Sequence, residues 1–467
     1  MGFHPVGEAA DARIGVTRDQ TKGQRMDDTS RSDPALLRRV AISSLLGTAI
    51  EYYDFLVYGT MSALVFGTIF FPDSDPAVAT IAAFGTLAAG YVARPVGGIL
   101  FGHFGDRIGR KSMLVLTMTL MGVASFLVGV LPTFAAVGVA APIMLVSLRV
   151  IQGVAIGGEW GGATLMVTEY AEPHRRGAWN GVMQMGSPIG SLLSVAVVTA
   201  ITLMPDETFM SWGWRVPFLV SLLLLALGIY VRLSITESPV FEEAKRAGAR
   251  PEGPPLVEVL RSPGNLVLAC AVGIGPFALT ALISTYMISY ATGIGYHRTD
   301  VMTALIFTST TALVTIPLFS ALSDRVGRRA VIVAGAIGIV CYAWPFYALI
   351  DVGSVPLLTA AMVIAQVLQS LMYAPLGALF SEMFGTRVRY TGASMGYQFA
   401  ALLGAGFTPL IASSLMADGI SRTPLVALAA GCGVVSLVAI WRVSETRGTD
   451  LTEGGVPPRG SVHGRNR

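Results

Sequence analysis

The sequence predicts an all-α membrane protein whose twelve transmembrane helices form two pseudo-symmetric six-helix bundles. The first reason is composition: of 467 residues, 53% are hydrophobic and 13% are charged, about half the charged fraction of a soluble globular chain. The mean hydropathy is +0.64. The second reason is a set of apolar runs long enough to cross a bilayer. The third is a pair of charged motifs that recurs once at nearly the same offset.

A helix needs about 20 apolar residues to cross a bilayer. Runs of this kind predict spans at 40–70, 77–104, 112–131, 136–168, 176–203, 213–235, 263–292, 300–322, 330–350, 355–381, 389–416 and 421–442. A stretch rich in charge and proline at 237–261 predicts a cytoplasmic linker. It separates a bundle at 38–236 from a second bundle at 262–443, with a disordered cytoplasmic tail at 1–37 and another tail at 444–467.

Basic residues gather in alternate loops, as the positive-inside rule requires. The even loops hold Arg107, Arg110, Lys111, Arg175, Arg176, Arg325, Arg328, Arg329, Arg387 and Arg389, whereas the odd loops hold only Arg298 and Arg422. This asymmetry predicts a multi-pass protein of the inner (plasma) membrane with both termini in the cytoplasm. The small net charge of +3 argues against a nucleic-acid partner. Cys270, Cys341 and Cys432 show no metal-ligand spacing, so no metal or other cofactor is expected.

Two charged motifs recur in the same order. Asp106-Arg107-Ile-Gly109-Arg110 joins spans two and three, and Asp324-Arg325-Val-Gly327-Arg328 joins spans eight and nine, 218 positions later. We interpret each loop as a latch whose glycine takes a positive φ. Its aspartate would accept from N–H groups at the start of the next helix, and its arginines would pair with a glutamate after span four or ten. The predicted cytoplasmic gate comprises Asp106, Arg110, Glu169, Arg176, Asp324, Arg328, Glu382 and Arg389.

The doubled loop resembles the signature of the major facilitator superfamily, although Ser320 stands where the first copy has Gly102. Further segments between about 38 and 445 resemble its metabolite:proton symporter family. They are Glu51-Tyr-Tyr-Asp54, Ala93-Arg94-Pro95, Arg149-Val-Ile-Gln152, Gly157-Gly-Glu159-Trp160-Gly-Gly162, Trp212-Gly-Trp214-Arg215 and Glu237-Ser-Pro239. The fourth is most similar to the shikimate-transporter branch. The resemblance implies secondary active uptake by proton symport and alternating access, with the substrate held between the halves.

Ionisable residues within predicted spans are candidates for function, because a charge in the membrane is costly. Glu51 and Asp54 are i, i+3 neighbours in span one, and Arg149 lies in span four. By resemblance to sugar:proton symporters, Asp54 and Arg149 are expected to form the proton-coupling pair, with Glu51 as the rival proton carrier. Protonation of Asp54 would then release Arg149 to an anionic substrate. The alternative is a static ion pair that only fixes helix packing.

Other polar residues in the spans are candidates for the binding pocket. Arg94 is expected either to bind substrate or to pair with Glu159, which we interpret as a structural partner. Arg215 and Arg232 lie near helix ends and are expected to extend to the interface. The predicted substrate-binding residues are Tyr58, Arg94, Gln152, Trp160, Gln184, Tyr286, Gln369 and Tyr373.

A buried arginine in an otherwise neutral pocket favours a hydroxylated monocarboxylate such as shikimate or another organic acid. A zwitterion such as proline or betaine, held by Arg149 with Asp54 or Glu51, is the alternative, although the 444–467 tail has no heptads of the osmosensing type. A drug:proton antiporter is disfavoured because Ser187-Pro188 interrupts its Gly-Pro element, and a non-transporting receptor would not need buried titratable groups. No phosphate-binding loop or catalytic spacing is present, so we expect a monomeric transporter in lipid rather than an enzyme.

Overall fold

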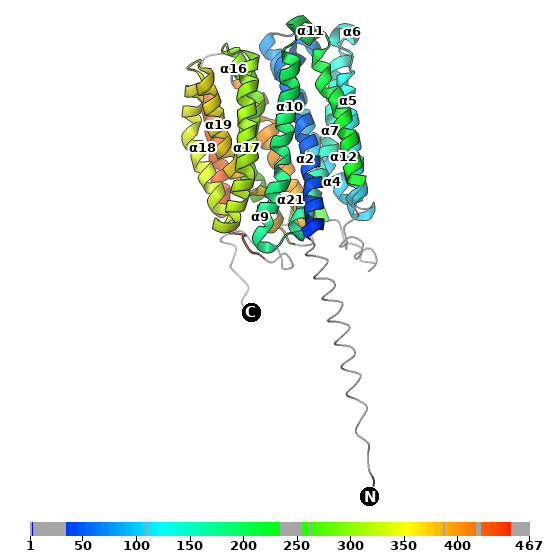
Figure 1. The fold of residues 1–467 in the computed structure, drawn as a ribbon, viewed down its shortest axis with the longest axis vertical. Helices are drawn as coiled ribbons and strands as arrows, with labels where there is room; N and C mark the ends of the chain where they lie inside the picture. The colour runs from blue at the N-terminus through cyan, green and yellow to red at the C-terminus, as the bar shows by residue number, and fades with distance from the viewer. Residues whose placement is uncertain are drawn as a thin grey trace.

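The computed structural model describes residues 2, 34–108, 110–233, 255–261, 263–385, 388–416 and 422–449, and within these ranges the chain is α-helical with short π and 3-10 turns and no strands. Figure 1 shows the helices standing side by side as one elongated bundle. Twelve of the helical stretches in the described residues are apolar enough to lie in lipid.

The first half contains six spans. Its elements are α2 (Pro34–Met61), η1 (Ser62–Phe66), α3 (Gly67–Phe70), α4 (Pro76–Ile108), α5 (Arg110–Gly129), α6 (Phe134–Val137), α7 (Ala140–Gly157), α8 (Glu159–Tyr170), η2 (Pro173–Arg175), α9 (Arg176–Gln184), α10 (Gly186–Thr202), α11 (Asp206–Ser211), η3 (Gly213–Arg215) and α12 (Val216–Leu233).

The second half repeats this plan. Its elements are α15 (Gly264–Ala281), η4 (Leu282–Tyr286), α16 (Met287–Gly293), α17 (Arg298–Val326), α18 (Arg328–Ile350), α19 (Val355–Tyr373), α20 (Leu376–Met383), α21 (Arg389–Ala401), η5 (Leu402–Gly406), α22 (Thr408–Leu415) and α23 (Thr423–Arg442). A short helix, α14 (Pro255–Arg261), precedes α15 inside the region predicted as a linker.

The twelve predicted spans are confirmed, because twelve helical stretches of the described chain are long and apolar enough to cross a membrane, from Leu37–Phe70 to Thr423–Arg442. An even number of spans brings the start of α2 and the end of α23 to the same end of the bundle, which we call the terminal end. It lies at the bottom of Figure 1, near α9, whereas α6, α11 and α16 lie at the opposite, distal end.

The helical irregularities also repeat. A π-helical turn interrupts span one at η1, beginning at Ser62, and another interrupts span seven at η4, beginning at Leu282. Their 220-residue separation is close to that of the charged loops. Such turns concentrate at functional positions because they redirect a helix without ending it. Gly327 takes φ +99° between α17 and α18, as its loop motif predicts.

Glycines bring α4 and α7 into backbone contact within the first half. A Cβ atom on Gly153 would overlap the carbonyl oxygen of Gly90, and one on Gly157 would overlap the carbonyl oxygen of Arg94. Small residues at such spacing let membrane helices approach closely. The contact fixes Arg94 of α4 and Arg149 of α7 in register.

The two halves meet along α9 and α10 of the first and α17 of the second, and α17 lies beside α10 in Figure 1. Gly181 has no room for a side chain because Ser320 packs against it. At the distal end, the Arg298 guanidinium lies 3.2 Å from the Asp206 carboxylate of the other half. The halves therefore touch at both ends of the bundle.

Candidate functional site

Six charged side chains are buried together in the first half. The acids Glu51, Asp54 and Glu159 and the bases Arg94, Arg149 and Arg232 each expose 5% or less of their surface. Three acids balance three bases, so the cluster carries no net formal charge. That balance matters because an unpaired ion in a low-dielectric interior costs several kcal/mol, on the order of 3–5 when a partner is removed.

Asp54 and Arg149 are linked through a third residue. Arg149 Nη1 donates to Gln152 Oε1 at 3.0 Å, and Gln152 Nε2 donates to Asp54 Oδ2 at 3.0 Å. The structure thus replaces the direct ion pair expected from the sequence with a bridge. Gln152, which was predicted to bind substrate, has both ends of its amide engaged in this bridge. An amide suits this position because its oxygen accepts from a cation while its nitrogen donates to an anion.

Further contacts hold the two ends of this bridge. Ser221 Oγ donates to Asp54 Oδ1 at 3.4 Å, and Gln152 Nε2 also donates to Ser125 Oγ at 2.6 Å. The Arg149 guanidinium lies 4.2 Å from the centre of the Tyr58 ring, a cation–π distance. Among the described residues its Nε has no hydrogen-bond partner. Arg149 therefore keeps one buried donor for another acceptor.

Glu51 belongs to a different pair. Its carboxylate lies 3.8 Å from Arg94 Nη1, and the Arg94 guanidinium lies 4.2 Å from the centre of the Tyr91 ring. The Phe55 ring separates the two arginines, with Arg94 at 5.4 Å and Arg149 at 5.5 Å from its centre. The two candidate proton carriers of α2 thus face separate arginines.

Glu159 pairs with Arg232 of α12, and the contact is a direct hydrogen bond between buried groups. The expectation that Glu159 pairs with Arg94 is wrong, because Arg94 is turned towards Glu51 on α2. The expectation that Arg232 extends to the interface is also wrong: this arginine exposes only 5% of its surface. Arg215 does behave as a helix-end residue, since its Nη1 donates to the carbonyls of Gly129 and Leu131.

Aromatic residues join the two halves beside these charges. Tyr52 of α2 bonds through its hydroxyl to that of Tyr373 on α19, at 2.9 Å. Trp160 of α8 stacks on Tyr397 of α21, with ring centres 3.7 Å apart. Trp160 and Tyr373 were predicted pocket residues. Tyr52 was not singled out, although it lies directly between Glu51 and Tyr53 in a motif that was.

The other predicted pocket residues are spread over both halves. Gln184 Nε2 donates to the Ala374 carbonyl across the interface at 2.8 Å, and Gln369 Nε2 donates to Thr280 Oγ1 at 2.8 Å inside the second half. The ring of Tyr286 lies 6.4 Å from Phe84 of the first half. Tyr58 bonds to Thr86 at 2.7 Å, and its ring centre lies 4.2 Å from the Arg149 guanidinium.

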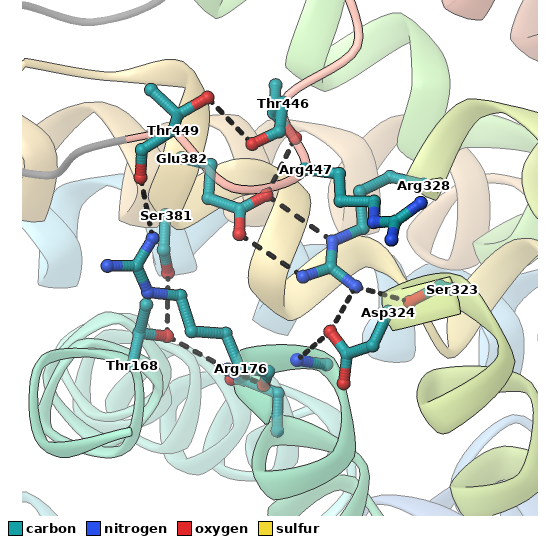
Figure 2. Close-up of polar contacts among 12 residues, drawn as sticks. Thr168, Arg176, Ser323, Asp324, Arg328, Ser381, Glu382, Thr446, Arg447 and Thr449 are labelled. Carbon is teal, nitrogen blue, oxygen red and sulfur yellow. Dashed lines mark hydrogen bonds and ion pairs between the residues drawn. The ribbon is translucent and has the colours of Figure 1, made fainter. Parts of the chain in front are cut away.

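The predicted gate is a network that joins the halves at the terminal end, as Figure 2 shows. The Asp324 carboxylate accepts from the backbone N–H groups of Gly177 and Ala178, at 2.9 and 2.8 Å. These groups begin α9, so the aspartate caps a helix of the opposite half. The sequence had predicted that it would cap the next helix along the chain. The carboxylate is well placed because the start of a helix carries partial positive charge.

Arg328 connects this cap to the rest of the gate. Its Nη1 lies 2.6 Å from Asp324 Oδ1, and its Nη2 lies 3.2 Å from Glu382 Oε1, which is the expected ion pair. Glu169 acts electrostatically on Arg389, and Arg389 Nε donates to the Phe384 carbonyl at 3.1 Å. The side chains of Asp106 and Arg110, predicted for the first copy of the gate, lie outside the described residues.

The segment after α23 completes the network and was not predicted to take part. Glu445 accepts from the backbone N–H of Arg328 at 2.9 Å, and Thr446 Oγ1 donates to Glu382 Oε2 at 2.7 Å. Arg176 of the first half donates to the Thr449 carbonyl at 2.8 Å. Residues 444–449, which were predicted to begin a tail, therefore connect the two halves in Figure 2.

Comparisons with known proteins match nearly the whole chain. The family model described as Major Facilitator Superfamily matches residues 44–396 and 291–462. The shikimate transporter of Escherichia coli (strain K12) is 38% identical over 86% of this chain and 94% of its own length. The inner membrane metabolite transport protein YhjE of the same strain is 38% identical over 88% and 95%.

More distant proteins share the architecture. The proline/betaine transporter of Salmonella typhimurium (strain LT2) is 32% identical over 86% of this chain and 82% of its own length. A solved structure of the proton:xylose symporter XylE superposes with a TM-score of 0.70 at 19% identity, covering 90% of this chain and 98% of that one. At this identity the likeness concerns the fold.

Proposed function

Because this chain belongs to the major facilitator superfamily, and is a multi-pass membrane transporter rather than an enzyme, we propose that it takes up a small organic acid together with a proton. The relatives that match it over most of its length are membrane transporters of metabolites. The finer proposal rests on one observation above the others: Asp54 and Arg149 are both buried and joined through Gln152, while the arginine keeps an unused donor.

The bridge supplies a means of coupling. A charged Asp54 holds the Gln152 amide, and the amide oxygen holds Arg149. When Asp54 takes a proton, its charge-assisted hydrogen bond weakens to an ordinary one, a loss of about half its strength. Gln152 is then free to turn, and Arg149 becomes available to a carboxylate of the substrate. Loss of the proton on the other side restores the bridge and displaces the substrate.

The proposed substrate class rests on the residues that the second half contributes opposite Arg149. The second half contributes tyrosines and amides to the interface, so a monoanion that also carries hydroxyl groups fits better than a dianion. Shikimate is a hydroxylated monocarboxylate, and the shikimate transporter is 38% identical to this chain. With arginines concentrated at the terminal end, we place that end and both chain termini in the cytoplasm.

A zwitterion such as proline or betaine is the second candidate. The proline/betaine transporter matches 86% of this chain, and the first half offers an acid beside each of two arginines. Such a substrate would use Arg149 for its carboxylate and Glu51 or Asp54 for its cationic group.

The proposal is tested with purified protein in proteoliposomes carrying an imposed pH gradient. Labelled shikimate, other hydroxylated monocarboxylates, proline and betaine are compared. We expect a monocarboxylate to accumulate only with the gradient. Asp54→Asn cannot change charge, so it should abolish accumulation while sparing exchange at equal pH. A pH gradient equivalent to 100 mV supplies about 2.3 kcal/mol for each proton that enters. The expected loss of accumulation is therefore about 50-fold.

The matched control is Asp73→Asn, the same substitution at an exposed position between the first two spans. It should accumulate substrate as the parent does. Uptake that ignores the pH gradient would rule out proton symport, and accumulation of zwitterions alone would select the second candidate. Intact accumulation in Asp54→Asn would indicate that Glu51, rather than Asp54, carries the proton. Glu51→Gln would then test this assignment.

A further inference from the structure

Span four is broken at Gly158. α7 ends at Gly157, and α8 begins at Glu159. The N–H group of Gly158 bonds to the Ala155 carbonyl, three residues back, at 3.4 Å. Gly158 is the N-cap of α8, so its carbonyl accepts the first hydrogen bond of that helix, and its second lone pair can accept from another donor.

The donors come from the opposite half. Gln398 Nε2 donates to the Gly157 carbonyl at 3.3 Å, and the Tyr390 hydroxyl donates to the Gly158 carbonyl at 3.0 Å. Both belong to α21. Residues spaced by three or four positions share one face of a helix, and the same face carries Tyr397, which stacks on Trp160. One face of α21 thus covers the break.

Each side of the break is attached to a different partner. α7 is fixed to α4 of its own half, because Gly153 and Gly157 lie against α4 carbonyls. α8 lies between α2 and α9 of its own half and α21 of the other half, where Gly161 leaves room for Ser394. A movement of α21 relative to α4 therefore acts on the turn at Gly158.

The first residue after the break is Glu159, which is bonded to Arg232. Both of these groups, and Arg94, act electrostatically on the Glu51 carboxylate. The Glu159–Arg232 pair fits tightly, since a Cβ atom on Gly47 of α2 would overlap it. A change of angle at Gly158 swings the Glu159 carboxylate relative to Arg232 and alters the field at Glu51.

We infer that Tyr390 and Gln398 are positioning residues that transmit the movement of the halves to the buried charges through the Gly158 break. With the halves in the present arrangement, their hydrogen bonds hold the break and keep Glu159 on Arg232. When α21 withdraws, the two carbonyls lose their donors, α8 turns and the pair separates. The inference rests on the proposed function, because it requires the two halves to move. It adds a physical connection between that movement and the buried charges that carry the proton.

The first test needs no substrate. Hydrogen–deuterium exchange of residues 155–165 is measured in lipid nanodiscs for the parent chain, Tyr390→Phe and the double variant Tyr390→Phe/Gln398→Leu. Two lost hydrogen bonds of ordinary net strength correspond to about 25-fold faster exchange. The control is Tyr296→Phe, which loses a tyrosine–carbonyl bond of 2.7 Å to Ile350 inside the second half. Exchange near Gly158 that matches this control would overturn the inference.

The second test uses the proteoliposomes and the ratio of gradient-driven accumulation to exchange at equal pH. Tyr390→Phe should lower this ratio several-fold, about fivefold for one hydrogen bond of ordinary net strength, whereas Tyr296→Phe should not. In a Glu159→Gln background the effect of Tyr390→Phe should disappear, because its target is already gone. An undiminished, additive effect would mean that Tyr390 only stabilises the fold and would overturn the inference.

The two tests separate the inference from the proposed function. If the parent chain accumulates no substrate under a gradient, proton symport is wrong, and the exchange measurement still decides whether α21 holds the break. If the parent accumulates substrate but exchange near Gly158 is insensitive to Tyr390 and Gln398, the proposed function stands and the positioning role is wrong.

Discussion

At the residue scale, the central feature is that one neutral amide separates a buried acid from a buried base. A direct Asp54–Arg149 pair would be held by strong attraction in a low-dielectric interior. With Gln152 between them, each charge keeps a hydrogen bond, and neither is neutralised by contact. A side chain that can rotate, rather than a permanent ion pair, then decides whether Arg149 is engaged.

This arrangement predicts that Gln152→Leu will destabilise the folded protein more than a similar substitution in a network of neutral side chains. It leaves the buried Asp54 carboxylate and Arg149 guanidinium without their shared partner, at a cost of about 3–5 kcal/mol. Gln366→Leu is the control, because Gln366 Nε2 bonds to Gln369 Oε1 and Ser370 Oγ, both neutral. Its expected cost is about 1–3 kcal/mol. Thermal denaturation in detergent compares the two, and equal losses would contradict the bridge.

At the element scale, glycine determines which helices move together. The α4–α7 contact is backbone against backbone, so these helices form one rigid unit that carries Arg94 and Arg149. The break at Gly158 then separates this unit from α8. A ridge of small residues next to an irregular turn thus divides span four into a part fixed to α4 and a part that contacts both halves.

The glycine contact predicts that Gly153→Ala will destabilise the first half. Its Cβ would overlap the Gly90 carbonyl oxygen, which cannot yield as a side chain does, so we expect a loss of about 3 kcal/mol or more, at the upper end for overpacking. Gly85→Ala on α4 is the control, because no atom lies within 4 Å of its added Cβ. The folded fraction after heating, measured by size-exclusion chromatography, should fall for Gly153→Ala alone. Equal behaviour would show that α4 and α7 can separate freely.

At the scale of the whole molecule, the two ends of the interface are held unequally. The terminal end has a carboxylate on two backbone amides, an arginine that joins two acids and a segment tied to both halves. The distal end has the Arg298–Asp206 pair, whose side chains expose 38% and 88% of their surface. Exposed pairs contribute about 0–1 kcal/mol. The described contacts therefore favour the state in which the two halves are closed at the terminal end.

This inequality predicts that Asp324→Asn will open the terminal end. The substitution removes the charge from the cap on α9 and from the contact with Arg328, which should shift the ratio of closed to open molecules about tenfold. Spin labels at the exposed positions 174 and 326, with the three native cysteines replaced, report the distance between the halves. A longer component should appear in the distance distribution.

The control for that experiment is Asp351→Asn, which removes an ion pair of 2.5 Å with Arg422 at the distal end of the second half. Because this pair does not join the halves, the distribution should stay as in the parent chain. An unchanged distribution in Asp324→Asn would show that the cap on α9 does not hold the halves together.

The sequence alone determined the number of spans, the duplicated plan and five of the six buried charges, Arg232 being the exception. These properties depend only on short stretches of sequence. About twenty apolar residues can span lipid wherever they occur, and a charge inside such a run is easily recognised. The glycine ridge of α7 and the positive φ of Gly327 were predictable for the same reason. The family resemblance also came from short motifs that need no knowledge of neighbours in space.

Only the tertiary structure decided which charges meet. Glu159 pairs with Arg232 rather than Arg94. Gln152 lies between Asp54 and Arg149, and Asp324 caps a helix 147 positions away in the sequence. Such pairings depend on helix rotation and crossing, which are set by packing over many residues rather than by spacing along one segment. Neither Tyr390 nor Gln398 was assigned a role from the sequence, because their contacts are with the irregular backbone of another helix.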